Sequence, residues 1–299
     1  MHGSETTDNA YVALTEEHSG SEDRWAFGTG FSEALAGVDT TIPGHVNRAD
    51  LSTYCLMLGD DALVLSQRLI EWCTDAPELE EEVALANIAL DLLGQARLLL
   101  ARSGVAEGIG RDEDTLAYFR DAEEFRNVVL AEVPGGDFGR SVLRLLVVAT
   151  WRLALFRRLV DAHDPVLAAI AARGVNECTY HAEYAAAWTV RLGDGTDYSH
   201  ERMLAAVADV DPHYAQLFRA HPVEKRLAEQ GVATDPATLR EEVGTALEPV
   251  LDAARLDWQP TAAPGTPPPW GRDGQHTPGL SELLTEMQSV ARAHPNARW

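Results

Sequence analysis

The sequence predicts an all-α protein, and three observations support that prediction. Apolar residues recur at three- and four-residue spacing over four long stretches of the chain. Helix start and stop signals bound these stretches, with Asp or Pro near their beginnings and Gly near their ends. No stretch of comparable length alternates apolar and polar residues between turn dipeptides, as the strands of a sheet do.

The first two predicted helices follow each other closely. The first begins at Asp50 or Ser52 and runs to about Cys73. The second has Pro77 in its first turn, followed by a run of glutamates that suits the positive end of the helix dipole. It stops at Gly104, a glycine placed to end a helix in the left-handed conformation.

The next two helices form a second pair. The third spans about 138–160, and the fourth begins with Asp164 as N-cap and Pro165 in its first turn and ends near residue 193. Four long helices of this kind fit a four-helix bundle. Residues 112–131 predict a short helical connection between the pairs. The fold class is therefore all-α, a ferritin-like four-helix bundle with a long crossover.

The rest of the chain divides by composition. Residues 1–24 predict a disordered acidic tail, and 25–258 the bundle domain with added helices at about 197–208, 211–221 and 236–253. Residues 259–270 form a Pro-rich linker. The remainder, 271–299, carries a C-terminal amphipathic helix at about 279–294, which we expect to pack on the bundle.

Charge and hydropathy narrow the function classes. The formal net charge of -23 argues against nucleic acids and anionic membranes as partners, since these polyanions repel it. No charge-free apolar run approaches the length of a membrane span, and the N-terminus lacks an export signal. We therefore expect a cytoplasmic protein. The three cysteines are isolated in apolar stretches and predict reduced core thiols.

The second helix contains a carboxylate where a buried helix is expected. Residues 83–100 are apolar almost all round, yet Asp91 lies among them in line with Asn87 and Gln95. A buried carboxylate costs several kcal/mol unless it is paired or binds a metal. Asp91 therefore needs a partner, and the fourth helix offers Glu177 and His181 at helical spacing.

A di-iron bundle provides a template for such residues. It takes a Glu from each of two helices and Glu-x-x-His from each of the other two. Here Gly94 stands three residues after Asp91, where histidine is required, and Tyr180 three residues after Glu177. His181 comes one residue late, and 138–160 contains no Asp or Glu. The sequence predicts no di-iron site in this chain.

Two interpretations of these polar residues remain open. The first is an internal network in which Arg68, Arg97 or Arg173 neutralises Asp91 and Glu177. The second is a metal or small-ligand site, which would make the chain an active iron-binding oxidoreductase that uses Asp91, Glu177 and His181. A separate alternative for the function of the whole chain is a free helical scaffold or binder with no link to oxygenases. No catalytic, cofactor-binding or metal-ligating residue is assigned, and His181 is a weak residual candidate.

Several long segments resemble the family of PaaC-type structural subunits of phenylacetyl-CoA epoxidase, a multicomponent monooxygenase of phenylacetate degradation. The resemblance begins near residue 50 and continues to the C-terminus. Its segments are YCLMLGDDALVLSQRLIEWC (54–73), PELEEEVALANIALDLLGQARLLL (77–100), EEFRNVVLAEVPGGDF (123–138), WTVRLGDGTDYSHERM (188–203) and GRDGQHT (271–277).

This resemblance implies a non-catalytic subunit. In the family, a related ferritin-like subunit holds the di-iron centre and epoxidises the aromatic ring with O2, and an NADPH-dependent reductase supplies the electrons. The resemblance therefore implies that catalytic subunit, further small subunits and the reductase as partners. It implies no cofactor in this chain. The former metal-site positions that it implies are Gln67, Asp91, Gly94, Glu177 and Tyr180.

Overall fold

The computed structural model describes residues 35–259 and 269–297. The predicted acidic tail, 1–24, and most of the predicted Pro-rich linker lie outside the described residues. Within the described ranges every regular element is helical. The predicted all-α fold is confirmed.

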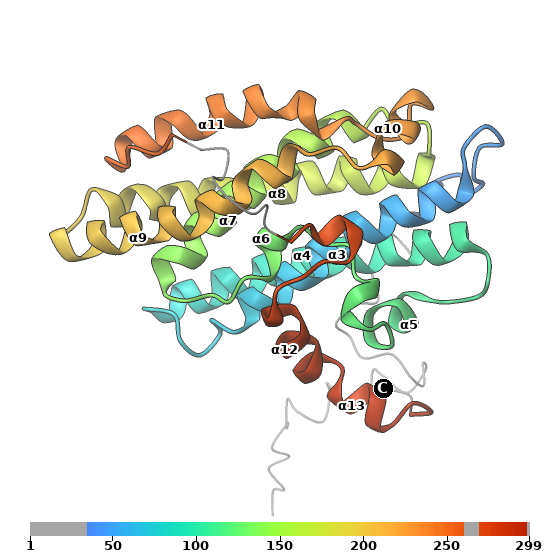
Figure 1. The fold of residues 1–299 in the computed structure, drawn as a ribbon, viewed down its shortest axis with the longest axis horizontal. Helices are drawn as coiled ribbons and strands as arrows, with labels where there is room; N and C mark the ends of the chain where they lie inside the picture. The colour runs from blue at the N-terminus through green and yellow to red at the C-terminus, as the bar shows by residue number, and fades with distance from the viewer. Residues whose placement is uncertain (1–34, 260–268, 298–299) are drawn as a thin grey trace, which may run out of the picture. The chain divides into compact units, whose positions relative to one another are not determined.

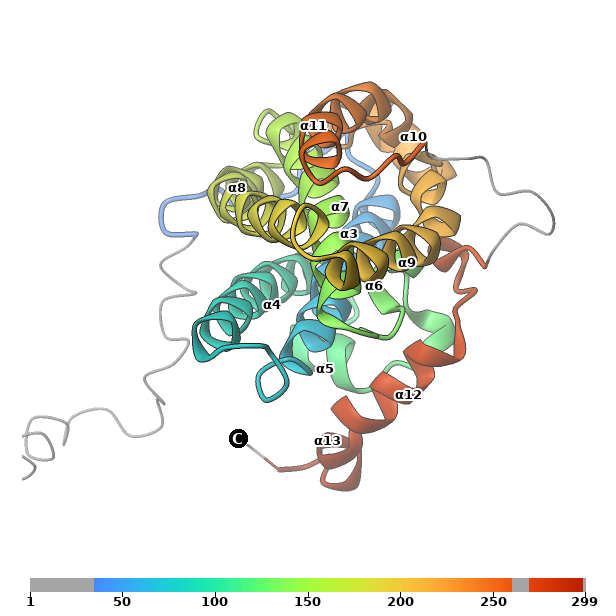
Figure 2. The same ribbon diagram turned by 90° about the vertical axis from the view of Figure 1, so that its left-hand side faces the viewer.

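Four long helices form the bundle (Figures 1 and 2). They are α3 (Arg48–Ile70), α4 (Leu79–Glu107), α7 (Phe138–Leu159) and α8 (Pro165–Gly193). Helix α3 packs along α4 and α7 along α8, and α4 also contacts α8. The buried faces of these helices supply most of the large apolar side chains of the core.

The second pair of helices is bounded as the sequence predicts. Asp137 caps α7, and its side chain accepts a hydrogen bond from the Arg140 amide. Asp164 caps α8 in the same way, through the amide of Leu167, and Pro165 occupies the first turn. These caps satisfy amides that have no partner within the helix.

The first pair differs from the prediction at both helices. Helix α3 ends at Ile70 rather than near Cys73, and α4 begins at Leu79 with Glu78 as N-cap, so Pro77 precedes the helix instead of lying in its first turn. Helix α3 begins earlier, because Asn47 is its N-cap and Asp50 instead pairs with Arg226. Helix α4 continues past Gly104 and ends at Gly108, which has a φ of 78°. Gly104 lies inside the helix, where the backbone carbonyl of Arg111 approaches so closely that a Cβ would clash with it. Gly104 is therefore required for close packing, although in the sequence it looks like a residue that ends a helix.

Short helices make the crossover and the additions to the bundle. The crossover contains α5 (Glu113–Tyr118), η1 (Ala122–Glu124) and α6 (Val129–Glu132). After the bundle come α9 (Asp197–Tyr214), η2 (Ala215–Phe218), α10 (Pro222–Glu229), η3 (Pro236–Leu239), α11 (Arg240–Ala253), η4 (Gly271–Asp273), α12 (Pro278–Met287) and α13 (Ser289–Ala293). Helix α10 was not predicted, and α9 runs on through Pro212 beyond its predicted end.

The C-terminal segment, residues 269–297, contacts both the bundle and the crossover. Arg68 of α3 donates to the carbonyl of Gly279, at 2.8 Å. Gln288 donates to the carbonyls of Ala117 and Arg120, each at 3.0 Å. In Figure 1 helices α12 and α13 lie beside the crossover helix α5.

Helix α4 is unusually apolar for its position in the bundle. Among the described helices, it alone has the length and composition that crossing a membrane requires, and 56% of its most apolar window is buried within the protein. A core helix of a water-soluble bundle passes the same test. The sequence had predicted burial all round, but Val83, Leu90 and Leu93 are exposed. That part of the prediction is wrong.

Candidate functional site at the bundle centre

Asp91 of α4 and His181 of α8 form a pair. Their Oδ2 and Nε2 atoms are 3.1 Å apart. His181 is buried, whereas 36% of the Asp91 side chain is exposed. Asp91 is therefore less deeply buried than the sequence suggested. The partner that it was expected to need is a histidine rather than an arginine.

Glu177 makes a second polar contact between these two helices. Its Oε1 atom accepts a hydrogen bond from Arg173 Nε at 2.7 Å, and its Oε2 atom accepts one from Gln95 Nε2 at 2.8 Å. The expectation that Arg173 neutralises Glu177 is confirmed. The other two candidate arginines pair elsewhere, Arg68 with Glu71 and Arg97 with Glu113.

A buried guanidinium continues this chain of contacts into the bundle. Arg152 of α7 donates through Nε to Gln95 Oε1 at 2.8 Å and through Nη1 to the carbonyl of Leu58 at 3.2 Å. Its planar group lies over the ring of Phe156 at 4.5 Å. Burial lowers the pKa of Arg152, because a charged group loses hydration there. We call Arg173, Glu177, Gln95 and Arg152 the central network.

Arg152 is the residue that sequence reasoning missed. The di-iron template requires only a carboxylate from the helix that carries it, so it predicts no role for an arginine there. A single arginine between Trp151 and Leu153 in an apolar stretch is the signal that was available. It places a positive charge between the helices, where a metal centre needs anionic donors.

We do not expect the neighbouring thiol, that of Cys178, to bind a metal. Cys178 is buried beside Gln95, with Nε2 and Sγ 3.9 Å apart. Burial raises the pKa of the Cys178 thiol to about 11. Metal ligation requires the thiolate, which surroundings of this kind disfavour. Cys178 and Cys55 are buried free thiols, as predicted, whereas Cys73 is only half-buried.

The former metal-site positions do not supply a set of metal ligands. Gly94 is buried and has no donor atom, Gln67 is half-buried on α3, and Tyr180 is 49% exposed. Glu177 already engages Arg173 and Gln95 with both carboxylate oxygens. In the part of the chain that the structure describes, no group of three or more His, Cys, Asp or Glu side chains is arranged to hold a metal ion. These residues do not fit a di-iron centre.

A second polar cluster lies under the C-terminal segment. Three buried carboxylates form it, each with a basic partner: Asp60 with Arg120 at 2.5 Å, Asp61 with Arg272 at 2.8 Å, and Glu132 with His276 at 2.6 Å. We call these six residues the C-terminal clasp. Two of the three basic partners come from the GRDGQHT motif. This motif therefore attaches the C-terminal segment to α3 and to the crossover.

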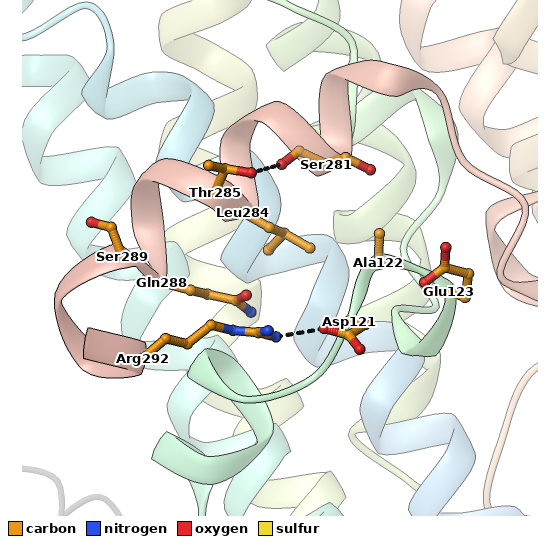
Figure 3. Close-up of a pocket in the computed structure, with 9 residues that line it drawn as sticks. All are labelled: Asp121, Ala122, Glu123, Ser281, Leu284, Thr285, Gln288, Ser289 and Arg292. Carbon is orange, nitrogen blue, oxygen red and sulfur yellow. Dashed lines mark hydrogen bonds and ion pairs between the residues drawn. The ribbon is translucent and has the colours of Figure 1, made fainter. Parts of the chain in front are cut away.

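The groove in Figure 3 is shallow and lies outside the bundle. It runs between η1 and helices α12 and α13, with Gln288 and Arg292 pointing toward the crossover. Arg292 pairs with Asp121 at 2.9 Å, and Gln288 is engaged with backbone carbonyls. Three of its polar side chains, Asp121, Gln288 and Arg292, already have partners within the chain.

Comparison with known proteins places the chain in a family. A family model described as "Phenylacetic acid catabolic protein" matches residues 37–299. The chain belongs to this family. It is 43% identical over 249 residues to one subunit of the 1,2-phenylacetyl-CoA epoxidase of Escherichia coli strain K12, covering 83% of this chain and 99% of that protein. The resemblance found in the sequence is confirmed, and the relative is part of a multi-subunit monooxygenase.

Proposed function

We propose that this chain is a non-catalytic structural subunit of a 1,2-phenylacetyl-CoA epoxidase complex in aerobic phenylacetate degradation. The complex takes O2 and NADPH, and a related ferritin-like subunit holds its di-iron centre. Further small subunits and a reductase complete the complex. We also propose that the chain acts in the cytoplasm.

The buried guanidinium of Arg152 is the observation that carries the structural role. It adds a positive charge next to Gln95, which in turn donates to Glu177, the only carboxylate of the central network, whose oxygens are both engaged. Two iron ions at this place would add further positive charge with few anions to balance it. The chemistry therefore belongs to another chain, and this one supports it by assembly.

The first test is reconstitution. The isolated chain is refolded or incubated with ferrous iron, desalted and measured for iron and for a di-iron absorption band. We expect far less than one iron per chain. Stoichiometric iron with that band overturns the proposal.

The second test is turnover by the assembled complex. Co-expression with the di-iron subunit of the same organism, followed by sizing, is expected to give one hetero-oligomer. Phenylacetyl-CoA turnover is expected to fall on omission of this chain and to survive Arg152→Lys and His181→Gln within it. Loss of turnover with normal assembly in either variant contradicts a purely structural role.

The contact between Asp91 and His181 favours one alternative, an iron-binding oxidoreductase that uses Asp91, Glu177 and His181. It requires Glu177 to leave Arg173 and Gln95 and turn toward the pair. Iron that binds to the wild-type chain but not to His181→Gln would support this alternative.

A further inference from the structure

One side of α4 carries a line of uncovered apolar side chains. Leu79, Val83, Leu90 and Leu93 are between 37% and 70% exposed, and the half-buried Ala86 lies among them. These five residues follow one another at alternating four- and three-residue spacing. Such spacing places them on one face of a helix over about 21 Å. We call them the α4 stripe.

Exposed apolar side chains are concentrated on this helix. Five of the thirteen large apolar side chains that are exposed among the described residues belong to α4, the stripe residues other than Ala86 together with Val105. Single exposed apolar residues are common on soluble proteins, whereas a contiguous group marks a contact surface. A contact surface on α4 also explains why so apolar a helix is incompletely buried.

The spacing of the stripe indicates what kind of surface covers it. Alternating steps of four and three residues form the narrow seam by which one helix packs against another. Acidic residues border the seam, with Glu80 and Asp91 on one side of the helix and Glu82 on the other. Arg97 continues the line beyond Leu93 but is paired with Glu113, and Asp91 is paired with His181. An anionic membrane is repelled by such borders, whereas a helix with basic residues beside its apolar seam is attracted.

Charge also discriminates between a second copy and a different chain. Every copy carries a formal net charge of -23 and the same acidic borders, so two copies repel each other. We propose that the α4 stripe receives an amphipathic helix of a different chain, with apolar residues at the same spacing and Lys or Arg beside them. This inference rests on the proposed function, and it names the catalytic ferritin-like subunit as that chain.

The test uses full-length protein and that subunit from the same organism. Leu90→Glu places a charge in the middle of the stripe, and Leu204→Glu on α9 is the matched control, since the two leucines are 51% and 46% exposed. Circular dichroism melting verifies that both variants fold. We expect Leu90→Glu to raise the Kd of the complex at least about tenfold and Leu204→Glu to leave it unchanged. An unchanged Kd for Leu90→Glu overturns the inference while the proposed function stands.

The remaining outcomes concern which molecule covers the α4 stripe. A wild-type chain that binds no such subunit overturns both the inference and the proposed function. A wild-type homodimer in sedimentation that Leu90→Glu dissociates, or flotation of the wild type with phosphatidylglycerol vesicles that Leu90→Glu abolishes, overturns the choice of occupant. Glu80→Lys is expected to raise the Kd of the hetero-complex severalfold, and an unchanged value removes the charge argument.

Discussion

The central network and the C-terminal clasp both bury polar side chains, yet they balance charge differently. In the clasp each carboxylate meets its own basic partner at 2.8 Å or less, with both partners buried. In the central network the buried cation Arg152 reaches the carboxylate of Glu177 only through the neutral amide of Gln95. Glu177 in turn pairs with the exposed Arg173.

This difference indicates which interactions hold the fold. A directly paired buried charge becomes very costly when its partner is removed, because the remaining charge stays in a poorly hydrated place. A charge that is balanced indirectly depends less on any one neighbour. The clasp therefore fastens the C-terminal segment and the crossover to the bundle, whereas the central network links α4, α7 and α8 without a direct pair of buried charges.

The largest effect is expected from Arg272→Met. It leaves Asp61 buried without its guanidinium and should lower the free energy of unfolding by about 3–5 kcal/mol. Urea unfolding at pH 7 measures this. The control is Arg158→Met, which removes a half-exposed pair with Glu242 and should cost less than about 1 kcal/mol. Equal effects of the two variants would contradict the role assigned to the clasp.

The next effect is a dependence of the free energy of unfolding on pH, which arises from Glu224 beside the clasp. Burial raises the pKa of Glu224 to about 7 from 4.5, although Arg272 acts in the opposite direction. Because the folded chain then holds this proton more tightly than the unfolded chain, stability falls as the pH rises from about 4.5 to 7 and is constant above that window. The loss is at most about 3 kcal/mol. Urea unfolding across this range should show that Glu224→Gln removes this part of the fall, and parallel curves for the two proteins would disprove it.

A smaller effect is expected from Arg152→Met. The variant removes two hydrogen bonds but also a cation whose pKa burial lowers. The opposing contributions should leave a net loss of about 1–2 kcal/mol in urea unfolding. A loss as large as that of Arg272→Met would show that the central network is as tightly coupled as the clasp.

The smallest effect is expected from Asp91→Asn. More than a third of the Asp91 side chain is exposed, so water screens its interaction with His181. The unfolding free energy should change by less than about 1 kcal/mol. A double-mutant cycle with His181→Gln isolates the coupling between the two side chains, and a coupling above about 2 kcal/mol would refute this expectation.

The parts of the fold that follow local rules could be predicted from the sequence. Asp164 and Pro165 define the start of α8 because capping depends on neighbouring residues alone. Gly104 misled the prediction because the contact that requires a glycine there comes from Arg111, in the following loop. The exposure of Leu90 was not predictable, because apolar spacing is the same for a helix buried in its own core and for one that awaits a partner.

The site was predicted only in part. Helical spacing identified Glu177 and His181 as residues of one face, and Arg173 as a neighbour one turn from Glu177. The link through Gln95 to Arg152 joins three helices, so it depends on how the bundle packs. The clasp joins residues 60 or more positions apart, such as Asp61 and Arg272 at 211 positions, for which one sequence gives no pairing signal.

The distance along the chain between the two halves of the clasp has a consequence for biosynthesis. Asp61 and Glu132 are synthesised 211 and 144 residues before their respective basic partners, Arg272 and His276. At that stage Asp60 and Arg120 can already join α3 to the crossover, whereas Asp61 and Glu132 have only water in place of those partners. We therefore expect the bundle and the crossover to assemble first, and residues 269–297 to dock last and complete the clasp.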